Sequence, residues 1–193
     1  MKKGVLKIVF AVLFLLPVCA NATIVKDFYT DGQIVDGNVF DTVNVWNTAT
    51  VTMTGGWAFY CNLYDSSKFN IYGGDAGVLY THQNSQAWLY ANDSVGAEIY
   101  DQSVVHIFNG GPSQSMFIYD NGQLHIYGYH LEYDELAAPN WVTGYWEDGQ
   151  EFWIYLRNIY TYNPEQVFLH EIPEPSTFCI MSLLTLFIRK RGD

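Results

Sequence analysis

Basic residues are scarce in the body of the chain. Of the nine lysines and arginines, three lie within residues 2–7 and three within 189–191, which leaves Lys26, Lys68 and Arg157 for residues 23–172. The same region contains 18 of the 20 acidic residues, so its formal net charge is −15. Lysine and arginine are the main phosphate-binding residues. The composition therefore argues against nucleic acid as a partner, and a surface of this charge should repel acidic polysaccharides.

Cysteine is rarer still. Cys19 and Cys179 lie near the two ends, and Cys61 stands alone between them, so an intradomain disulfide cannot form. We expect Cys61 to be a buried small apolar residue. A cysteine nucleophile would need a partner base and a lowered thiol pKa, and the sequence indicates neither.

Helical periodicity and the familiar catalytic motifs are also missing. The chain has no Gly-x-Ser-x-Gly, His-Glu-x-x-His or phosphate-binding loop. Glu132, Asp134 and Glu135 cluster, but a glycosidase needs a positioned carboxylate pair, and we interpret this cluster as a solvated acidic loop. We predict no catalytic residues and no cofactor.

A repeat of about 18 residues fills the centre of the chain. Its copies read "VWNTATVTMTGG" from 45, "LYDSSKFNIYGG" from 63, "WLYANDSVGAEIYD" from 88, "IYDQSVVHIFNGG" from 99 and "IYDNGQLHIYG" from 118. Met53, Ile71, Leu89, Ile107 and Ile126 hold one place, and Asn47, Asp65, Asp101 and Asp120 recur at a polar turn. One copy departs from this pattern. It is the third copy, "LYTHQNSQAWLY" from 79, and it is interpreted as having two extra residues and no Asp.

Each copy is too short to bury its own apolar face, whereas stacked copies can do so. We therefore predict an all-β fold, a single-domain β-solenoid similar to a parallel β-helix, with about 18–19 residues per coil. The competing fold is an antiparallel sandwich, which does not require the same residue type at the same place in every copy.

Strand alternation separates the interior from the exterior. The predicted inward residues are Phe69, Ile71, Ala87, Leu89, Val105, Ile107, Leu124 and Ile126. The predicted outward residues are Asn70, Tyr72, Trp88, Tyr90, His106, Phe108, His125 and Tyr127.

The aromatic outward residues are candidate glycan-binding residues, because sugars stack their apolar faces on exposed rings. They are Tyr72, Trp88, Tyr90, Phe108 and Tyr127. Two alternatives stay open: residues 129–171 fold back over the rings, or the rings stack only to stabilise neighbouring coils.

Two metal sites were considered, and neither is predicted. His106 and His125 are one coil apart, but no third ligand is evident. Asp and Asn at the repeated turns could suggest calcium, yet at tight turns these residues normally bond their own backbone.

The body of the chain has two expected caps. In "GYWEDGQEFWIYL", Asp148-Gly149 between aromatic strands predicts a β-hairpin. A hairpin at the end of a solenoid would cover its last open edge. The expected organisation is an N-terminal cap at 23–44, solenoid repeats at 45–128 and a C-terminal β cap at 129–171.

Residues 1–22 have the pattern of a secretory signal peptide. Three lysines precede an apolar stretch, and Ala20-Asn21-Ala22 fits signal peptidase cleavage after Ala22. We expect a short signal helix here, with the Sec translocon and signal peptidase as partners.

The C-terminal residues 172–193 contain Pro173-Glu174-Pro175, an apolar run from Phe178 to Ile188, and Arg189-Lys190-Arg191. As a helix the run would reach about 17 Å, against a hydrocarbon core of about 30 Å. It can enter a membrane but spans it poorly.

These three parts, in this order and alongside a signal peptide, resemble the PEP-CTERM sorting signal of Gram-negative bacteria. The resemblance implies Sec export, transient retention in the inner membrane, recognition by an exosortase and delivery to the cell surface or an exopolysaccharide matrix. Residues 142–175 also resemble the last part of PEP-CTERM proteins with repetitive β ectodomains, in which a Trp-x-Asp-Gly hairpin is followed by a closing strand.

Two functions are carried forward. The first is a non-catalytic structural or adhesive surface protein that binds polysaccharide through the outward rings. The alternative is a carbohydrate-active enzyme, a glycosidase or lyase, on a β-helix scaffold. The scarcity of lysine and arginine argues against the lyase form.

Overall fold

The computed structural model describes residues 23–90, 96–111, 113–134, 140–158 and 163–173, and these contain strands and no helix. The strands are β1 (Val25–Phe28), β2 (Gly32–Ile34), β3 (Val39–Val45), β4 (Thr50–Leu63), β5 (Lys68–Thr81), β6 (Gln86–Leu89), β7 (Gly96–Ile99), β8 (Val104–Ile107), β9 (Ser113–Ile118), β10 (Gln123–Asp134), β11 (Asn140–Tyr145), β12 (Glu151–Leu156) and β13 (Val167–Glu171). The two predicted terminal helices lie outside the described residues.

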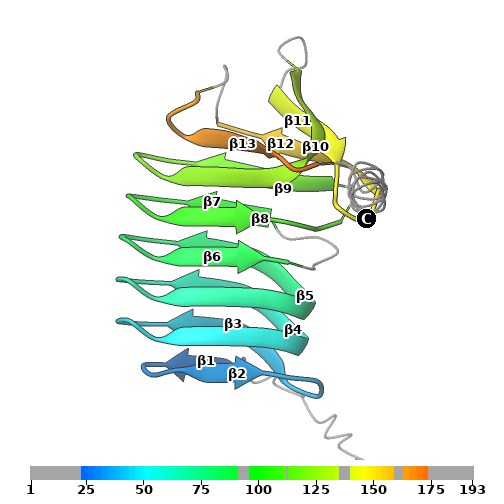
Figure 1. Cartoon of the computed structure of the whole chain (residues 1–193). Helices are drawn as coiled ribbons and strands as arrows, with labels where there is room; N and C mark the ends of the chain where they lie inside the picture. Colours follow the sequence, from blue (N-terminus) through cyan, green and yellow to red (C-terminus); the bar gives the residue numbers. More distant parts are fainter. Residues whose placement is uncertain (1–22, 91–95, 112, 135–139, 159–162, 174–193) are drawn as a thin grey trace, which may run out of the picture.

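The strands stack as parallel layers from β1 and β2 at one end to β13 near the other (Figure 1). The first sheet contains β2, residues 50–53 of β4, 68–71 of β5, β6, β8, the start of β10, and β13. The second sheet contains β1, β3, residues 57–63 of β4, 75–81 of β5, β7, β9 and β12. The solenoid-like stack makes about five turns.

The coil length follows from the strand register. Thr50 pairs with Lys68, Lys68 with Gln86, Gln86 with Val104 and Val104 with Gln123, which gives steps of 18, 18, 18 and 19 residues. This confirms the predicted period and the parallel solenoid, and it excludes the antiparallel sandwich.

Long strands β4 and β5 belong to both sheets because each bends between them. Gly56 and Gly74 lie at these bends with φ angles of 78° and 89°, in the left-handed region where a side chain is disfavoured. A Cβ atom at Gly74 would also come within 2.7 Å of the Gly55 backbone. Glycine is therefore required where the chain passes from one sheet to the other.

Apolar side chains from both sheets fill the space between them. All eight residues predicted to point inward on the first sheet have no solvent exposure. A fully buried leucine or isoleucine contributes roughly 1.5–3 kcal/mol. Thr81 is a polar exception in the second sheet, and its hydroxyl lies 2.7 Å from that of Ser103, which is also buried. The strand alternation in the sequence therefore predicted the buried residues of the first sheet correctly.

One turn between the sheets repeats with the same backbone in successive coils. Asn47, Asp65, Gln83, Asp101 and Asp120 all have φ between 53° and 62°. The predicted two extra residues of the third copy are wrong, because Thr81 pairs with Leu63 and Gln83 therefore occupies the place of Asp65.

Three of these turn side chains bond the backbone of a neighbouring coil, whereas we expected bonds to their own backbone. The N–H groups of Asn47, Asp65 and Gln83 donate to the side chains of Asp65, Gln83 and Asp101, at 2.9, 2.8 and 2.8 Å. Asp65, Gln83 and Asp101 therefore accept from the preceding coil and connect neighbouring coils.

The predicted hairpin is confirmed. Strands β11 and β12 pair antiparallel, and Gly149 takes a φ of 86° in the connection between them. The hairpin joins the stack through β12, which pairs parallel to β9, while β13 pairs parallel to β10.

At the other end, residues 23–44 contain β1, β2 and most of β3. These strands pair in parallel with later strands, as the coils of the repeat do.

Candidate binding surfaces

Two columns of rings run up the outer side of the first sheet. We call them the tyrosine ladder, made of Tyr72, Tyr90, Phe108, Tyr127 and His170, and the histidine ladder, made of Trp88, His106, His125 and Phe168. They arise because outward positions of successive coils lie in register. The predicted outward residues do face away from the core, but Trp88 belongs to a different column from the other candidate rings.

Rings of the tyrosine ladder lie almost parallel to one another. Their centroids are 4.6, 4.8, 4.2 and 4.3 Å apart from Tyr72 to His170, with interplanar angles between 2° and 11°. Each internal ring therefore covers the face of the next, and mainly ring edges and hydroxyls reach the solvent. A sugar needs an open ring face, and Tyr72, at the end of the ladder and 51% exposed, is the best placed to offer one.

The C-terminal region extends the ladders. Phe168 and His170 of β13 stack on His125 and Tyr127 at 4.5 and 4.3 Å. The described part of residues 129–171 thus contributes one more layer of rings. Sequence reasoning did not find these two residues, although Phe168 and His170 alternate in the same way as His125 and Tyr127.

Three imidazoles gather at the C-terminal end of the histidine ladder. The rings of His106 and His125 lie 4.7 Å apart, and His125 Nδ1 lies 2.9 Å from His170 Nε2. Burial, followed by the neighbouring His106 and His170, lowers the pKa of His125 to about 4. Burial, followed by His170, also lowers the pKa of His106. Neutral, stacked imidazoles fit this environment better than charged ones.

No group of three or more His, Cys, Asp or Glu side chains within the described ranges is arranged to hold a metal ion. Glu132 and Asp134 lie on β10 and are exposed, so the predicted acidic loop is a strand at these two positions. Cys61 is fully buried, as predicted, and burial raises the pKa of its thiol to about 12.

A third column of rings follows the repeated turn. Its members are Tyr29, Trp46, Tyr64, His82, Tyr100 and Tyr119. From Trp46 to Tyr119 the centroids of successive rings are 4.1 to 5.1 Å apart. Sequence reasoning missed this column, although each of the last five rings directly precedes a left-handed turn residue. Like the other ladders, it joins one coil to the next.

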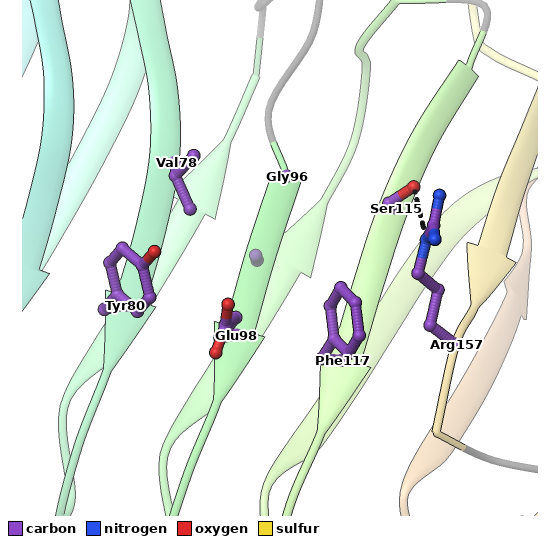
Figure 2. Close-up of a pocket in the computed structure, with 8 residues that line it drawn as sticks. Val78, Tyr80, Gly96, Glu98, Ser115, Phe117 and Arg157 are labelled. Carbon is purple, nitrogen blue, oxygen red and sulfur yellow. Dashed lines mark hydrogen bonds between the residues drawn. The ribbon is translucent and has the colours of Figure 1, made fainter.

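The second sheet has a different feature, a surface hollow of about 290 Å³ (Figure 2). Its described lining residues come from β5, β7 and β9 and from the residue after β12, and they are Val78, Tyr80, Gly96, Ala97, Glu98, Ser115, Phe117 and Arg157. Arg157 is one of only three basic residues in the body of the chain. Nothing in the sequence repeat singled out this hollow.

Most of the predicted sorting residues fall outside the described residues. These are Ala20, Ala22, Glu174, Pro175, Arg189, Lys190 and Arg191; Pro173 is described and is exposed just after β13. Within the described ranges no helix is long and apolar enough to cross a membrane.

Comparison with known proteins adds no relative. No protein-family model, curated protein or solved structure matches the chain. The function must therefore be argued from the chain itself.

Proposed function

We propose that the chain is an exported surface or extracellular-matrix protein with a non-catalytic, structural or adhesive role. The observation that carries the proposal is the combination of a signal-peptide pattern at 1–22 with a PEP-CTERM-like tail at 172–193. In this proposal the Sec translocon and signal peptidase act on the first segment. An exosortase then acts on the tail after transient retention in the inner membrane.

The architecture supports a structural role. Three ring columns, stacked turns and a continuous core join each coil to its neighbours, which suits a rigid spacer outside the cell. The formal charge of −15 over residues 23–172 favours neutral polysaccharide over acidic polysaccharide as a matrix partner.

A carbohydrate-active enzyme is the second candidate, and Arg157 in the hollow is the observation that favours it, because lyases use basic side chains. Glu98 is the sole carboxylate among the described residues that line the hollow, whereas a glycosidase needs two. Incubation with neutral and uronic-acid polysaccharides tests this candidate. Release of reducing ends or unsaturated uronates would favour an enzyme.

Replacement of Pro173, Glu174 and Pro175 by alanine tests the sorting proposal in the native host. We expect the variant to accumulate as a membrane-retained precursor with its tail intact. Pro164 and Glu165 form a matched control, because they are another exposed Pro-Glu pair only a few residues away. Normal maturation of the Pro173–Pro175 variant would contradict exosortase processing.

A further inference from the structure

On the outer side of the second sheet, a carboxylate separates two rings of neighbouring coils. Tyr80 pairs in register with Glu98, and Glu98 with Phe117. A carboxylate therefore lies where a ladder would have a third ring. Since neighbouring strands are about 4.8 Å apart, the two rings are about 10 Å apart and cannot stack on each other. Figure 2 shows Tyr80 and Phe117 on the two sides of Glu98.

Beside Glu98, on the same strand, the hollow is open because Gly96 has no side chain. Among the residues that the structure describes, a Cβ atom at Gly96 would meet only the Ser115 carbonyl oxygen, at 3.5 Å, which is an ordinary contact. Gly96 is an extended strand residue, so neither backbone conformation nor crowding requires a glycine here. The glycine keeps the hollow empty between Val78 and Ser115.

Polar groups of opposite charge lie at two sides of the hollow. The Tyr100 hydroxyl donates to Glu98, which fixes this carboxylate on the surface. On the other side, Arg157 Nε donates to Ser115 Oγ at 3.3 Å, and the guanidinium lies 5.8 Å from the Phe117 ring centroid. A guanidinium has five N–H donors in a planar fork, so Arg157 keeps donors beyond its Nε–H.

We propose that this hollow binds one neutral hexose residue of a glycan. The C–H face of a pyranose would pack against Phe117 or Tyr80, its hydroxyls would donate to Glu98, and its oxygens would accept from Arg157. A small, mostly apolar concavity with a few convergent polar groups is the usual form of such a site. The acidic surface disfavours a uronic acid in the same place.

This inference deepens the proposed matrix role and rests on it for the source of the glycan. It also moves the glycan site from the first sheet to the second. The difference is chemical: internal ladder rings cover one another, whereas Tyr80 and Phe117 face a hollow in which no third ring lies between them.

Binding of the full chain to an array of neutral gluco-, manno- and galacto-oligosaccharides tests the site. Gly96→Val fills the hollow with a side chain that strands favour, and we expect it to weaken binding at least tenfold while the protein stays folded. Arg157→Gln should weaken binding by roughly tenfold, because a charged donor is lost. Lys68→Gln is the matched control on the first sheet and should bind like the wild type, and Tyr72→Leu tests the alternative site on the tyrosine ladder.

Three results would overturn the proposal. One is a wild-type chain that retains none of the neutral oligosaccharides. The second is wild-type affinity in both Gly96→Val and Arg157→Gln. The third is a loss in Tyr72→Leu that equals the loss in Gly96→Val, which would return the site to the ladder. Processing of the Pro173–Pro175 variant is measured separately, so failed sugar binding and failed sorting can be distinguished.

Discussion

The two sheets of the solenoid use aromatic side chains differently. On the first sheet, ring follows ring in successive coils, and Phe108 is stacked between Tyr90 and Tyr127 at 4.8 and 4.2 Å. On the second sheet, Phe117 has Glu98 as its register partner in the preceding coil. Both phenylalanines are half-buried and point outward. The residue one coil away decides whether an outward ring stabilises the stack or remains open to a ligand.

Whether an aromatic repeat can bind a ligand depends on whether its rings stack on one another. In a stack with an 18-residue step, an uninterrupted column of rings covers its own binding surface. An interruption, with a small residue beside it, uncovers ring faces and leaves room between them.

Replacing each phenylalanine by alanine should give unequal losses of stability. Phe108→Ala removes two stacking contacts and partly buried area, and we expect the free energy of unfolding to fall by about 2–3 kcal/mol. Phe117→Ala should cost about 1 kcal/mol, because Phe117 has no stacked ring in the adjacent coil. Urea unfolding of both variants measures the difference. Equal losses of unfolding free energy in the two variants would contradict the difference between stacked and unstacked outward rings.

The repeated turn that contains Asp65, Gln83 and Asp101 connects the two sheets, so the loss of one of its side chains should lower the stability of the stack. Asp101→Ala removes the acceptor of the Gln83 N–H and places alanine at a φ of 59°. We expect a loss of about 2 kcal/mol from the hydrogen bond and the left-handed backbone together. Asp101→Asn keeps an acceptor and tolerates this φ, so it should stay within about 0.5 kcal/mol of the wild type. A similar loss in both variants would contradict the proposed role of the turn side chain.

The histidine ladder predicts that stability depends on pH. The pKa of His125 falls from its ordinary 6.5 to about 4, so between these values the unfolded chain binds more protons than the folded chain. Stability should therefore be retained above about pH 6.5 and decrease as the pH falls toward about 4. Thermal unfolding across this range should show a smaller decrease for His125→Phe, which keeps a ring in the column. Trp88→Phe leaves the histidines unchanged and should follow the wild type, and an unaltered profile in His125→Phe would contradict the argument.

The smallest expected effect is a gain. Gly96→Val should raise the free energy of unfolding by about 0.5–1 kcal/mol, because glycine weakens a strand and the added Cβ atom makes an ordinary contact with the Ser115 carbonyl oxygen. Urea unfolding measures this, and a clear loss of stability would show that the space at Gly96 is not open.

Much of the fold could be predicted because the repeat and strand alternation are local signals. Met53, Ile71 and Leu89 define the step, and the alternation around them identifies the core. The turn at Gln83 does not show the Asp of the other copies, because the structure requires only a left-handed backbone and a side-chain acceptor at this position.

The hollow could not be predicted, because it depends on pairing between distant segments. Arg157 reaches Ser115 only through the parallel register of β12 with β9, about 40 residues apart in sequence. The contribution of β13 to the ladders has the same origin, since Phe168 meets His125 across 43 residues. Periodicity gives no information on such pairings once the repeat has ended.

The mass and location of the mature protein in its host test the central proposal most directly. We predict a surface or matrix fraction whose intact mass corresponds to a chain that begins at Thr23 and ends near Pro173–Pro175. A full-length chain of 22.1 kDa found only in the cytoplasm would contradict the proposed export and sorting.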